Sequence, residues 1–333
     1  MDLLPAPDPL PGPPDAPDDS CGGDLLARLL VQAEAIFSAA RAGSTLRAYR
    51  HDLSQFRQWC ERNQLIALPA APQSVILYAT DLTKNHRKKW NTLSRRLAAI
   101  SQFHQQAGFE SPTKSWAVKQ FLGGLRRELG VAPVRKRPVL VADMKDLLSQ
   151  IPDSTLGRRD RALVLLGFSG AFRRSELVGL NVEDIEEQRE GIVLHIGRSK
   201  TDQEGQGRTI GIPRGPHERT CPVRALETWR RTAGIATGPL FRSVNRHGSV
   251  LAKRLSGEAV AMVIKRYIEP LGYDPTQFAG HSLRAGLATS AAAAGKSERA
   301  IMNQTGHRSA ATVRRYIRDG NLFRDNAAEG LDL

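Results

Sequence analysis

A chain of 333 residues is long enough for two domains with separate cores, and its composition is that of a globular protein. No apolar run approaches the roughly 18 residues of a membrane-spanning helix, no secretory signal opens the chain, and the three cysteines are too scattered for a disulfide framework or a metal cluster. The net charge is +14, and because residues 1–24 contribute −6, the rest of the chain holds +20. This basic body favours a polyanionic partner, although charge alone leaves open a solvated basic surface or binding to ribosomes.

The first part of the chain predicts an acidic arm followed by a helical domain. Residues 1–23 are rich in Pro, Asp and Gly, which predicts a disordered arm. Over residues 24–129, apolar side chains recur at helical spacing in five segments, and Pro72 and Pro112 stand where the third and fifth helices would begin. Trp59 and Trp90 fit the core of this domain better than a surface that stacks on bases. Its basic side chains suit the grip of a phosphate backbone, although a solvated face explains any one of them as simply: Lys84, Arg87, Lys88, Lys89, Arg95 and Arg96.

Residues 130–138 predict a basic linker. Pro133 and Pro138 block the continuation of a helix around three successive cations, Arg135, Lys136 and Arg137. These cations suit a strap that lies across phosphates. A hydrophilic hinge is the simpler alternative, and the two are compatible.

Residues 139–333 predict a second domain that mixes helices with a little β structure. Two β-branched runs, residues 192–196 and 208–212, flank a polar turn that contains Gly, and they predict one small antiparallel sheet. The fold class is therefore mainly α with two domains, a helical bundle followed by an α+β domain. Helices are expected at residues 141–151, 157–169, 173–179, 221–233, 257–269, 282–294 and 297–304.

Four segments of this second domain carry residue types that suit chemistry on a phosphodiester. They read SGAFRRSEL from Ser169, GRSKT from Gly197, HSLR from His281, and GH from Gly306 with Tyr316 in the same final stretch. Arg can hold a phosphate through two parallel hydrogen bonds. In HSLR, the His and the Arg lie three apart at an expected helix start, so they share a face near a helix end that favours anions. Each motif alone is weak, and the order and spacing of all four carry the signal.

This ordered set resembles the tyrosine recombinase, or phage integrase, family, and within it the Cre-type and plasmid or phage integrases. The resemblance covers most of the chain. It implies a SAM-like core-binding domain over residues 24–129 that grips DNA, and a catalytic domain over residues 139–333. It also implies a site-specific recombinase that cleaves and rejoins DNA through a 3′-phosphotyrosyl intermediate and a Holliday junction, with no metal and no other cofactor.

The same resemblance implies the partners and the location of the protein. The partners are double-stranded DNA with inverted-repeat target sites, three further copies of the chain in a tetrameric synapse, and an accessory directionality protein. The location is cytoplasmic, with the nucleoid, in a bacterium or from a phage or plasmid.

The resemblance assigns roles to individual residues. Arg173 and Arg284 would clamp the phosphate, and Arg174 is the neighbour that could be mistaken for Arg173. His281 would act in general acid/base catalysis on the tyrosine proton, and His307 would hydrogen-bond the phosphate, in a position where the family has His or Trp. The alternative for Arg173 is a surface Arg, and the alternative for His281 is a satisfied buried His.

Lys200 would act as the general acid for the leaving oxygen, and Glu176 would orient a histidine or an arginine of the site. Tyr316 would be the nucleophile, since it alone among the five tyrosines follows the Gly-His pair. Its phenolate form would be favoured by three neighbouring cations, Arg314, Arg315 and Arg318. An ordinary turn Lys, a helix Glu and a core Tyr are the respective alternatives.

Two rival functions remain open at this point, together with the role of the C-terminus. One rival is a topoisomerase-like enzyme that nicks and closes DNA without synapsis, and the other is a catalytically silent DNA-binding protein on the same fold. The C-terminal tail has apolar residues at helical spacing, and the resemblance implies that it docks on a neighbouring copy, with a frayed terminus or docking on its own domain as alternatives: Leu322, Phe323, Ala327 and Leu331.

Overall fold

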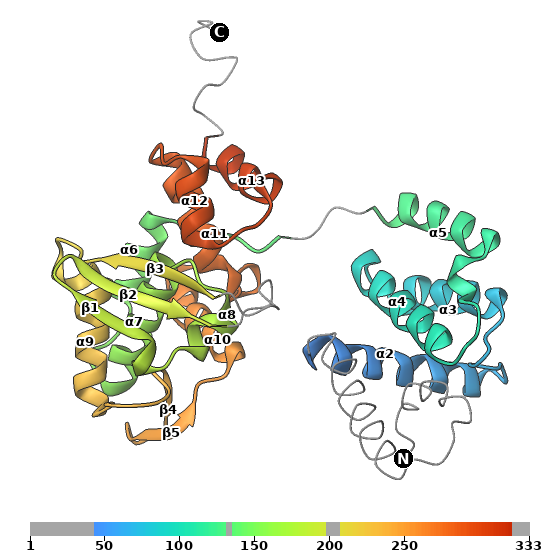
Figure 1. The fold of residues 1–333 in the computed structure, drawn as a ribbon, viewed down its shortest axis with the longest axis horizontal. Coiled ribbons are helices and arrows are strands. Elements are labelled where there is room, and N and C mark those ends of the chain that lie inside the picture. The colour runs from blue at the N-terminus through green and yellow to red at the C-terminus, as the bar shows by residue number, and fades with distance from the viewer. Residues whose placement is uncertain (1–42, 131–134, 198–206, 322–333) are drawn as a thin grey trace, which may run out of the picture. The chain divides into compact units, whose positions relative to one another are not determined.

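The computed structural model describes residues 43–130, 135–197 and 207–321, and the chain divides into two compact units, residues 1–133 and 134–333 (Figure 1). The acidic arm, the first expected helix, Lys200 and the C-terminal tail lie outside the described residues. Within the described ranges, no helix is both long and apolar enough to cross a membrane.

The described part of the first unit is a bundle of α-helices. Pro72 is the first residue of an α-helix, as expected. Pro112 instead opens a 3₁₀ turn, and the α-helix after that turn begins only at Trp116. Ser115 caps this last helix, because its side chain accepts a hydrogen bond from the backbone N–H of Val118. The helices are α2 (Gly43–Arg62), α3 (Pro72–Lys84), α4 (Trp90–Gln106) and α5 (Trp116–Leu129).

The apolar faces of these helices meet in one core. The rings of Phe56 on α2 and Tyr78 on α3 have their centroids 5.0 Å apart, and Ile100 on α4 is fully buried beside them in the same cluster. Trp59 is buried and Trp90 packs against this cluster, so the prediction that both belong to the core is confirmed.

The described part of the second unit contains eight α-helices, and the first seven match the seven ranges expected from the sequence. The eighth lies beyond the ranges expected from the sequence, and Val313 is its one fully buried residue. The helices are α6 (Val141–Ser149), α7 (Thr155–Ser169), α8 (Arg174–Gly179), α9 (Pro222–Ala233), α10 (Gly257–Ile268), α11 (His281–Ala293), α12 (Glu298–Thr305) and α13 (Ala310–Gly320).

Two small antiparallel sheets complete this unit. The first has the strand order β1 (Ile185–Gln188), β2 (Gly191–Ile196) and β3 (Arg208–Pro213), and the second pairs β4 (Arg242–Val244) with β5 (Val250–Arg254). The expected pairing of β2 with β3 is confirmed. The structure adds β1 and the second sheet, which the sequence did not reveal because no residue of these three strands is fully buried and so no apolar alternation marks them.

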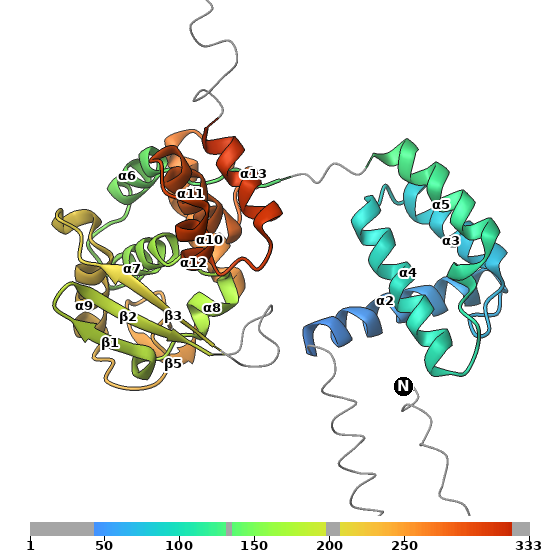
Figure 2. The ribbon, with the colours of Figure 1, turned by 45° about the horizontal axis from the view of Figure 1, so that its top comes forward.

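Helix α7 is the central element of the second unit. Nine of its 15 residues are buried, so its C-terminal end, which leads into the SGAFRRSEL segment, is held firmly in the core. In both views the end of β2 and the start of β3 lie next to α8, and α11, α12 and α13 are grouped together (Figures 1 and 2). The motifs found in the sequence therefore lie on elements that converge.

Candidate active site

Five of the six residues to which the sequence analysis gave a direct chemical role come from converging elements of the second unit. Arg173 directly precedes α8, and His281 is the first residue of α11 with Arg284 one turn later. His307 follows the end of α12, and Tyr316 lies in α13. The sixth, Lys200, lies outside the described residues, in the connection between β2 and β3.

A tight turn after α7 positions the first of these residues. Gly170 approaches the ring of Phe172 so closely that a Cβ on it would lie 2.0 Å from a ring carbon. Ala171 has a φ of +47°, in the left-handed region that costs a non-glycine residue energy. This conformation directs the carbonyl oxygen of Ala171 to Arg284, whose Nη1 donates to it over 2.8 Å.

Arg284 is almost fully buried, with 1% of its surface exposed. Its Nη2 is buried as well and has no hydrogen-bond partner among the described residues. Burial, and then repulsion from Arg173, lowers the pKa of Arg284 to about 10, which leaves it charged at neutral pH. A buried cationic donor without a partner is unfavourable unless an anion completes it.

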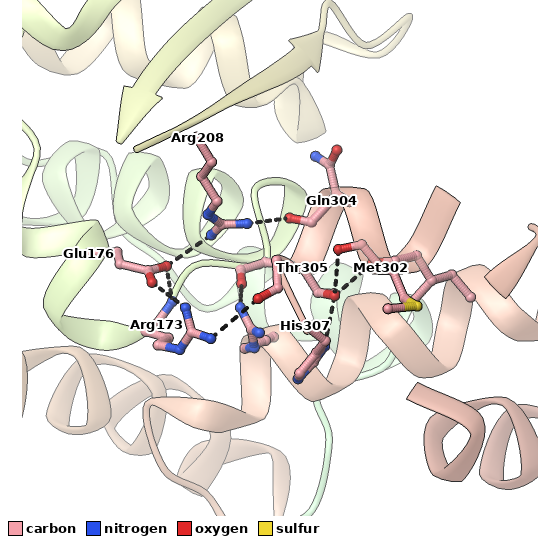
Figure 3. A network of polar contacts seen from close by, with 11 residues as sticks. Arg173, Glu176, Arg208, Met302, Gln304, Thr305 and His307 are labelled. Atoms are coloured by element: carbon pink, nitrogen blue, oxygen red, sulfur yellow. Dashed lines mark hydrogen bonds and ion pairs between the residues drawn. The ribbon is translucent and has the colours of Figure 1, made fainter. Parts of the chain in front are cut away.

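Glu176 is the carboxylate of the site, and it is shared by two arginines (Figure 3). One of its oxygens accepts from Nη1 of Arg173, and the other accepts from the backbone N–H of Arg173 at 3.0 Å and from Nη2 of Arg208 at 2.9 Å. Burial raises the pKa of Glu176, but the hydrogen bonds from Arg173 and the charge of Arg208 outweigh it, so the pKa is lowered overall. Glu176 is therefore ionised and holds the guanidinium group of Arg173.

Tyr316 and His281 form a hydrogen-bonded pair, with 3.0 Å between the hydroxyl oxygen and Nε2. The pKa of His281 is lowered by partial burial and then by the charges of Arg284 and Arg173. The imidazole is therefore neutral at neutral pH and can accept a proton from the tyrosine.

Of the three neighbouring cations expected to favour the phenolate form of Tyr316, Arg315 acts in that direction, but the pKa of the tyrosine is raised overall. Burial raises the pKa of Tyr316, and the positive charges of Arg284, Arg315 and Arg135 reduce the shift without reversing it. Arg314 is engaged elsewhere, since its Nε donates to Glu298 over 3.0 Å. The hydroxyl is therefore protonated at neutral pH and needs a base to remove its proton. His281 is the neighbouring residue that can accept this proton.

His307 lies beside the tyrosine, with 5.9 Å between the two ring centroids, and is fixed by Thr305. The hydroxyl of Thr305 donates to the carbonyl oxygen of Ile301 over 2.6 Å, and Nδ1 of His307 lies 2.7 Å from that hydroxyl oxygen. Nδ1 therefore carries the hydrogen in the neutral ring. Burial, followed by the charges of Arg284 and Arg173, lowers the pKa of His307 to about 3.

The charges of this site do not balance within the described residues. Three guanidinium groups, those of Arg173, Arg208 and Arg284, surround the single carboxylate of Glu176. No group of three or more His, Cys, Asp or Glu side chains in the described ranges is arranged to hold a metal ion. The arrangement suits an anion with several oxygen acceptors, held beside the hydroxyl of Tyr316.

The basic residues predicted to grip DNA from the first unit fall into two groups. Arg87, Lys88 and Lys89 are exposed, as a phosphate-binding loop requires. The other three have partners within the unit: Lys84 pairs with Glu128, Arg95 donates to the buried Asp52 over 2.8 and 3.0 Å, and Arg96 donates to the hydroxyl of Tyr78 over 2.6 Å. Arg95 is still about half exposed, so an ion pair with Asp52 leaves part of it available.

The linker cations are also engaged, and Arg137 most of all. Its guanidinium lies 4.4 Å from the ring centroid of Tyr273 and 5.7 Å from that of Phe278, and it pairs with Asp143 at 3.4 Å. Its backbone N–H donates to Gln277 over 2.7 Å. In this structure Arg137 anchors the end of the linker to the second unit.

Its two neighbours reach the elements that carry the chemistry. Lys136 donates to the carbonyl oxygen of Thr276, in the segment just before α11, over 2.5 Å. Nη1 of Arg135 lies 3.6 Å from Oδ2 of Asp319, which follows Tyr316 by one turn on α13. Both are exposed, so neither contact prevents a second contact with a phosphate.

Sequence reasoning missed Arg208, which belongs to the network of Glu176. A signal for it exists in the strand pattern, because β-strand side chains alternate between two faces. Arg208 shares the inward face of β3 with Ile210 and Ile212, both of which are buried. A cation that begins the buried face of a strand needs a partner inside the protein, and the sequence alone does not identify that partner.

Comparison with known proteins agrees with this geometry. Residues 139–321 match the phage integrase family, and residues 34–110 match the N-terminal SAM-like domain of phage integrases. An integrase/recombinase xerD homolog from Selenomonas ruminantium is 42% identical over 304 residues, which cover 90% of this chain and 89% of that protein. Recombinase cre of Escherichia phage P1 is 27% identical over 280 residues, which cover 78% of this chain and 80% of that protein.

Two solved structures share the fold at low sequence identity. The XerH site-specific recombinase bound to a palindromic difH substrate has a TM-score of 0.60 at 16% identity, with 86% of this chain and 80% of that chain covered. A lambda integrase dimer bound to a COC′ core site has a TM-score of 0.58 at 15% identity, with 89% and 77% covered. By its matched domains and its curated relatives, the chain belongs to the phage integrase family of tyrosine recombinases.

Proposed function

We propose that this protein recombines DNA at specific sites and that Tyr316 is the nucleophile that opens the phosphodiester. The observation that carries the proposal is the uncompensated positive charge beside the tyrosine, where Arg284 keeps a buried donor without a partner among the described residues. A phosphodiester has the negative charge that compensates this positive charge and the oxygen atoms that accept hydrogen bonds from these donors.

In the cleavage step, the hydroxyl oxygen of Tyr316 forms a bond to phosphorus while the bond from phosphorus to the 5′ oxygen breaks. The phenol proton passes to Nε2 of His281, 3.0 Å away. Lys200 protonates the leaving 5′ oxygen, in the role that the family resemblance implies. The 3′ end of the strand stays attached to the protein, so the energy of the cut bond is conserved.

Rejoining reverses these transfers. The 5′ hydroxyl of a second strand attacks the phosphotyrosine, its proton returns to the lysine, and His281 gives its proton back to the tyrosine. One exchange between two DNA sites produces a Holliday junction, and a second exchange resolves it. The guanidinium groups of Arg173 and Arg284 stabilise the charge on the non-bridging oxygens in both directions.

Assembly on the target site belongs to the same proposal. Two copies would occupy one inverted-repeat site in double-stranded DNA, and four would hold two sites in a synapse. The second unit has an apolar cavity of about 450 Å³ between α11, α12 and β3, lined among others by Leu287, Ala291 and Ile301. We propose that the apolar stripe of residues 322–331 from a neighbouring copy fills this cavity, since this stripe directly follows α13 and cannot be stable alone. The accessory directionality protein and the cytoplasmic location stay predictions.

The experiment that tests the proposed function begins with the DNA beside the gene. An inverted repeat around a short spacer, cloned twice in one supercoiled plasmid, is the substrate for the purified protein. Deletion or inversion of the segment between the two copies is the expected result. Relaxed plasmid without recombinants would instead favour the topoisomerase-like enzyme, and binding without any strand cleavage would favour the silent DNA-binding protein.

A further inference from the structure

Arg208 begins β3 and faces the interior of the second unit. It pairs in register with Ile196, the last residue of β2, so it stands at the base of the connection that contains Lys200. Only 19% of its side chain is exposed, and burial lowers its pKa more than the nearby carboxylate raises it. A cation in this position is costly, and its contacts have to compensate the loss of water.

Those contacts join two elements that are far apart in the sequence. Nη2 of Arg208 donates to Oε2 of Glu176 on α8 over 2.9 Å, and Nη1 donates to the backbone carbonyl oxygen of Gln304 on α12 over 3.1 Å (Figure 3). A planar guanidinium presents donors in fixed, divergent directions, so one side chain can hold both acceptors at once. Arg208 is therefore a bridge between the carboxylate that orients Arg173 and the end of α12.

The end of α12 is fitted to this guanidinium. Gly306 has a φ of +63°, and a Cβ at this position would lie 2.5 Å from Nη1 of Arg208. The side chain of Gln304 donates to the carbonyl oxygen of Ser169 over 2.7 Å and so fastens the same helix end to the turn that precedes Arg173. Because His307 directly follows Gly306, its backbone is set by these contacts.

We propose that Arg208 is a positioning residue for strand cleavage, which holds Arg173 and His307 in one arrangement by joining Glu176 to the end of α12. The inference rests on the proposed function. Without Arg208, the carboxylate of Glu176 keeps Arg173 as its only cationic partner among the described residues and draws it away from the phosphate. The end of α12 loses one of its contacts at the same time and keeps those of Gln304 with Ser169 and of Arg173 with Gly306, so two contacts with the phosphate weaken together.

The test compares Arg208→Gln with Arg214→Gln. Arg214 follows the other end of β3 and forms an exposed pair with Glu227, so it controls for the loss of a charge from the same strand. The rate of single-turnover cleavage of the target DNA should fall about 10- to 100-fold in Arg208→Gln. This decrease corresponds to the free energy of one hydrogen bond to a charged group. Arg214→Gln should cleave as the wild type does, and both variants should bind the target in gel shifts as the wild type does. Cleavage by Arg208→Gln at the rate of Arg214→Gln would overturn the proposal.

A second comparison separates positioning from a purely structural role. In a Glu176→Gln background, Arg208→Gln should cost several-fold less than it costs alone, because the two residues act through one contact. Equal losses in both backgrounds would contradict the proposal, whatever the melting temperatures.

Arg208→Lys covers the case in which Arg208→Gln folds poorly. It keeps the charge and most of the bulk, so it should melt as the wild type does, but a single ammonium replaces the fork, and cleavage should stay slower than in the wild type. Wild-type cleavage by Arg208→Lys would contradict the bridge. These results are read against wild-type protein: if the wild type itself formed no covalent adduct with DNA, the proposed function would fail, and not this inference alone.

Discussion

The hydroxyl oxygen of Tyr316 lies 3.0 Å from Nε2 of His281, although the two residues are 35 positions apart in the sequence. Burial raises the pKa of the tyrosine, and burial together with two arginines lowers the pKa of the histidine. At neutral pH the pair is therefore a neutral phenol beside a neutral imidazole. This is the starting state for attack by an oxygen nucleophile whose proton is taken by a general base.

The pH dependence of cleavage should report this base. His281 has to be unprotonated to accept the phenol proton, and its pKa lies below the ordinary 6.5. Single-turnover cleavage should therefore fall on acidification, with a midpoint above the pKa of the free protein because the charge of a bound phosphate raises the pKa of His281. His281→Ala should slow cleavage by about 10²- to 10⁴-fold and remove this limb. A rate that rises on acidification from pH 7.5 to pH 6 in the wild type would contradict the role of His281 as base.

His307 should behave as a hydrogen-bond donor whose proton depends on the bound phosphate. Its neutral ring directs the N–H to Thr305, so Nε2 can donate to an anion only when the ring is protonated. The pKa of about 3 holds without DNA, and the charge of a phosphate raises it. The indole of Trp carries an N–H at every pH, whereas the imidazole of His307 gains its second N–H as the pH falls. The ratio of the wild-type cleavage rate to the cleavage rate of His307→Trp should therefore increase as the pH falls.

His307→Phe is the control for this comparison, because it keeps a ring without a donor. We expect His307→Trp to cleave faster than His307→Phe at pH 7.5. Equal rates for the two variants would show that the position contributes packing and not a hydrogen bond.

Two neighbouring arginines should differ sharply in their effect on cleavage. Arg173 is held by Glu176 towards the site, whereas the side chain of Arg174 packs near Gly257 and Gly280. Arg173→Ala should lower single-turnover cleavage by orders of magnitude, since it removes a charge from the transferring phosphate. Arg174→Ala should change the chemical step little. A loss in Arg174→Ala as severe as that in Arg173→Ala would show that the assignment is shifted by one residue.

Removal of residues 322–333 should damage assembly and spare binding to a single site. The truncation ends after α13, whose Gly320 lies close to α11, so the described helices keep their contacts. Gel-shift titration should show a normal complex with one inverted-repeat site, and a synapsis assay with two sites should show a strong loss. Normal synapsis with a lowered melting temperature would instead indicate that the tail docks on its own domain.

The sequence predicted the parts of the site that are local. Arg173 with Glu176, and His281 with Arg284, lie one helical turn apart, so their residue types and spacing place them on one face before any tertiary structure is known. The helices of the second unit were predicted for a related reason, because their buried residues repeat at helical spacing.

The sequence did not predict which cations are already engaged inside the protein. Arg208 contacts Glu176, which is 32 residues away in the sequence, and Gln304, which is 96 residues away. Arg95 contacts Asp52, which is 43 residues away. Composition shows such residues only as positive charge. The same limit applies to the pKa of Tyr316, since adjacent charges are visible in the sequence and the burial that outweighs them is not.

The central claim is that Tyr316 becomes covalently attached to DNA, and mass spectrometry of the trapped complex tests it most directly. A target site with a nick next to the cleavage position releases the leaving strand and traps the adduct. The account predicts a nucleotide attached to the peptide that contains Tyr316 in the wild type, and no adduct in Tyr316→Phe, which should still shift the target DNA because phosphate contacts outside the nucleophile supply the binding. An adduct formed by Tyr316→Phe, or one mapped to another residue of the wild type, would contradict it.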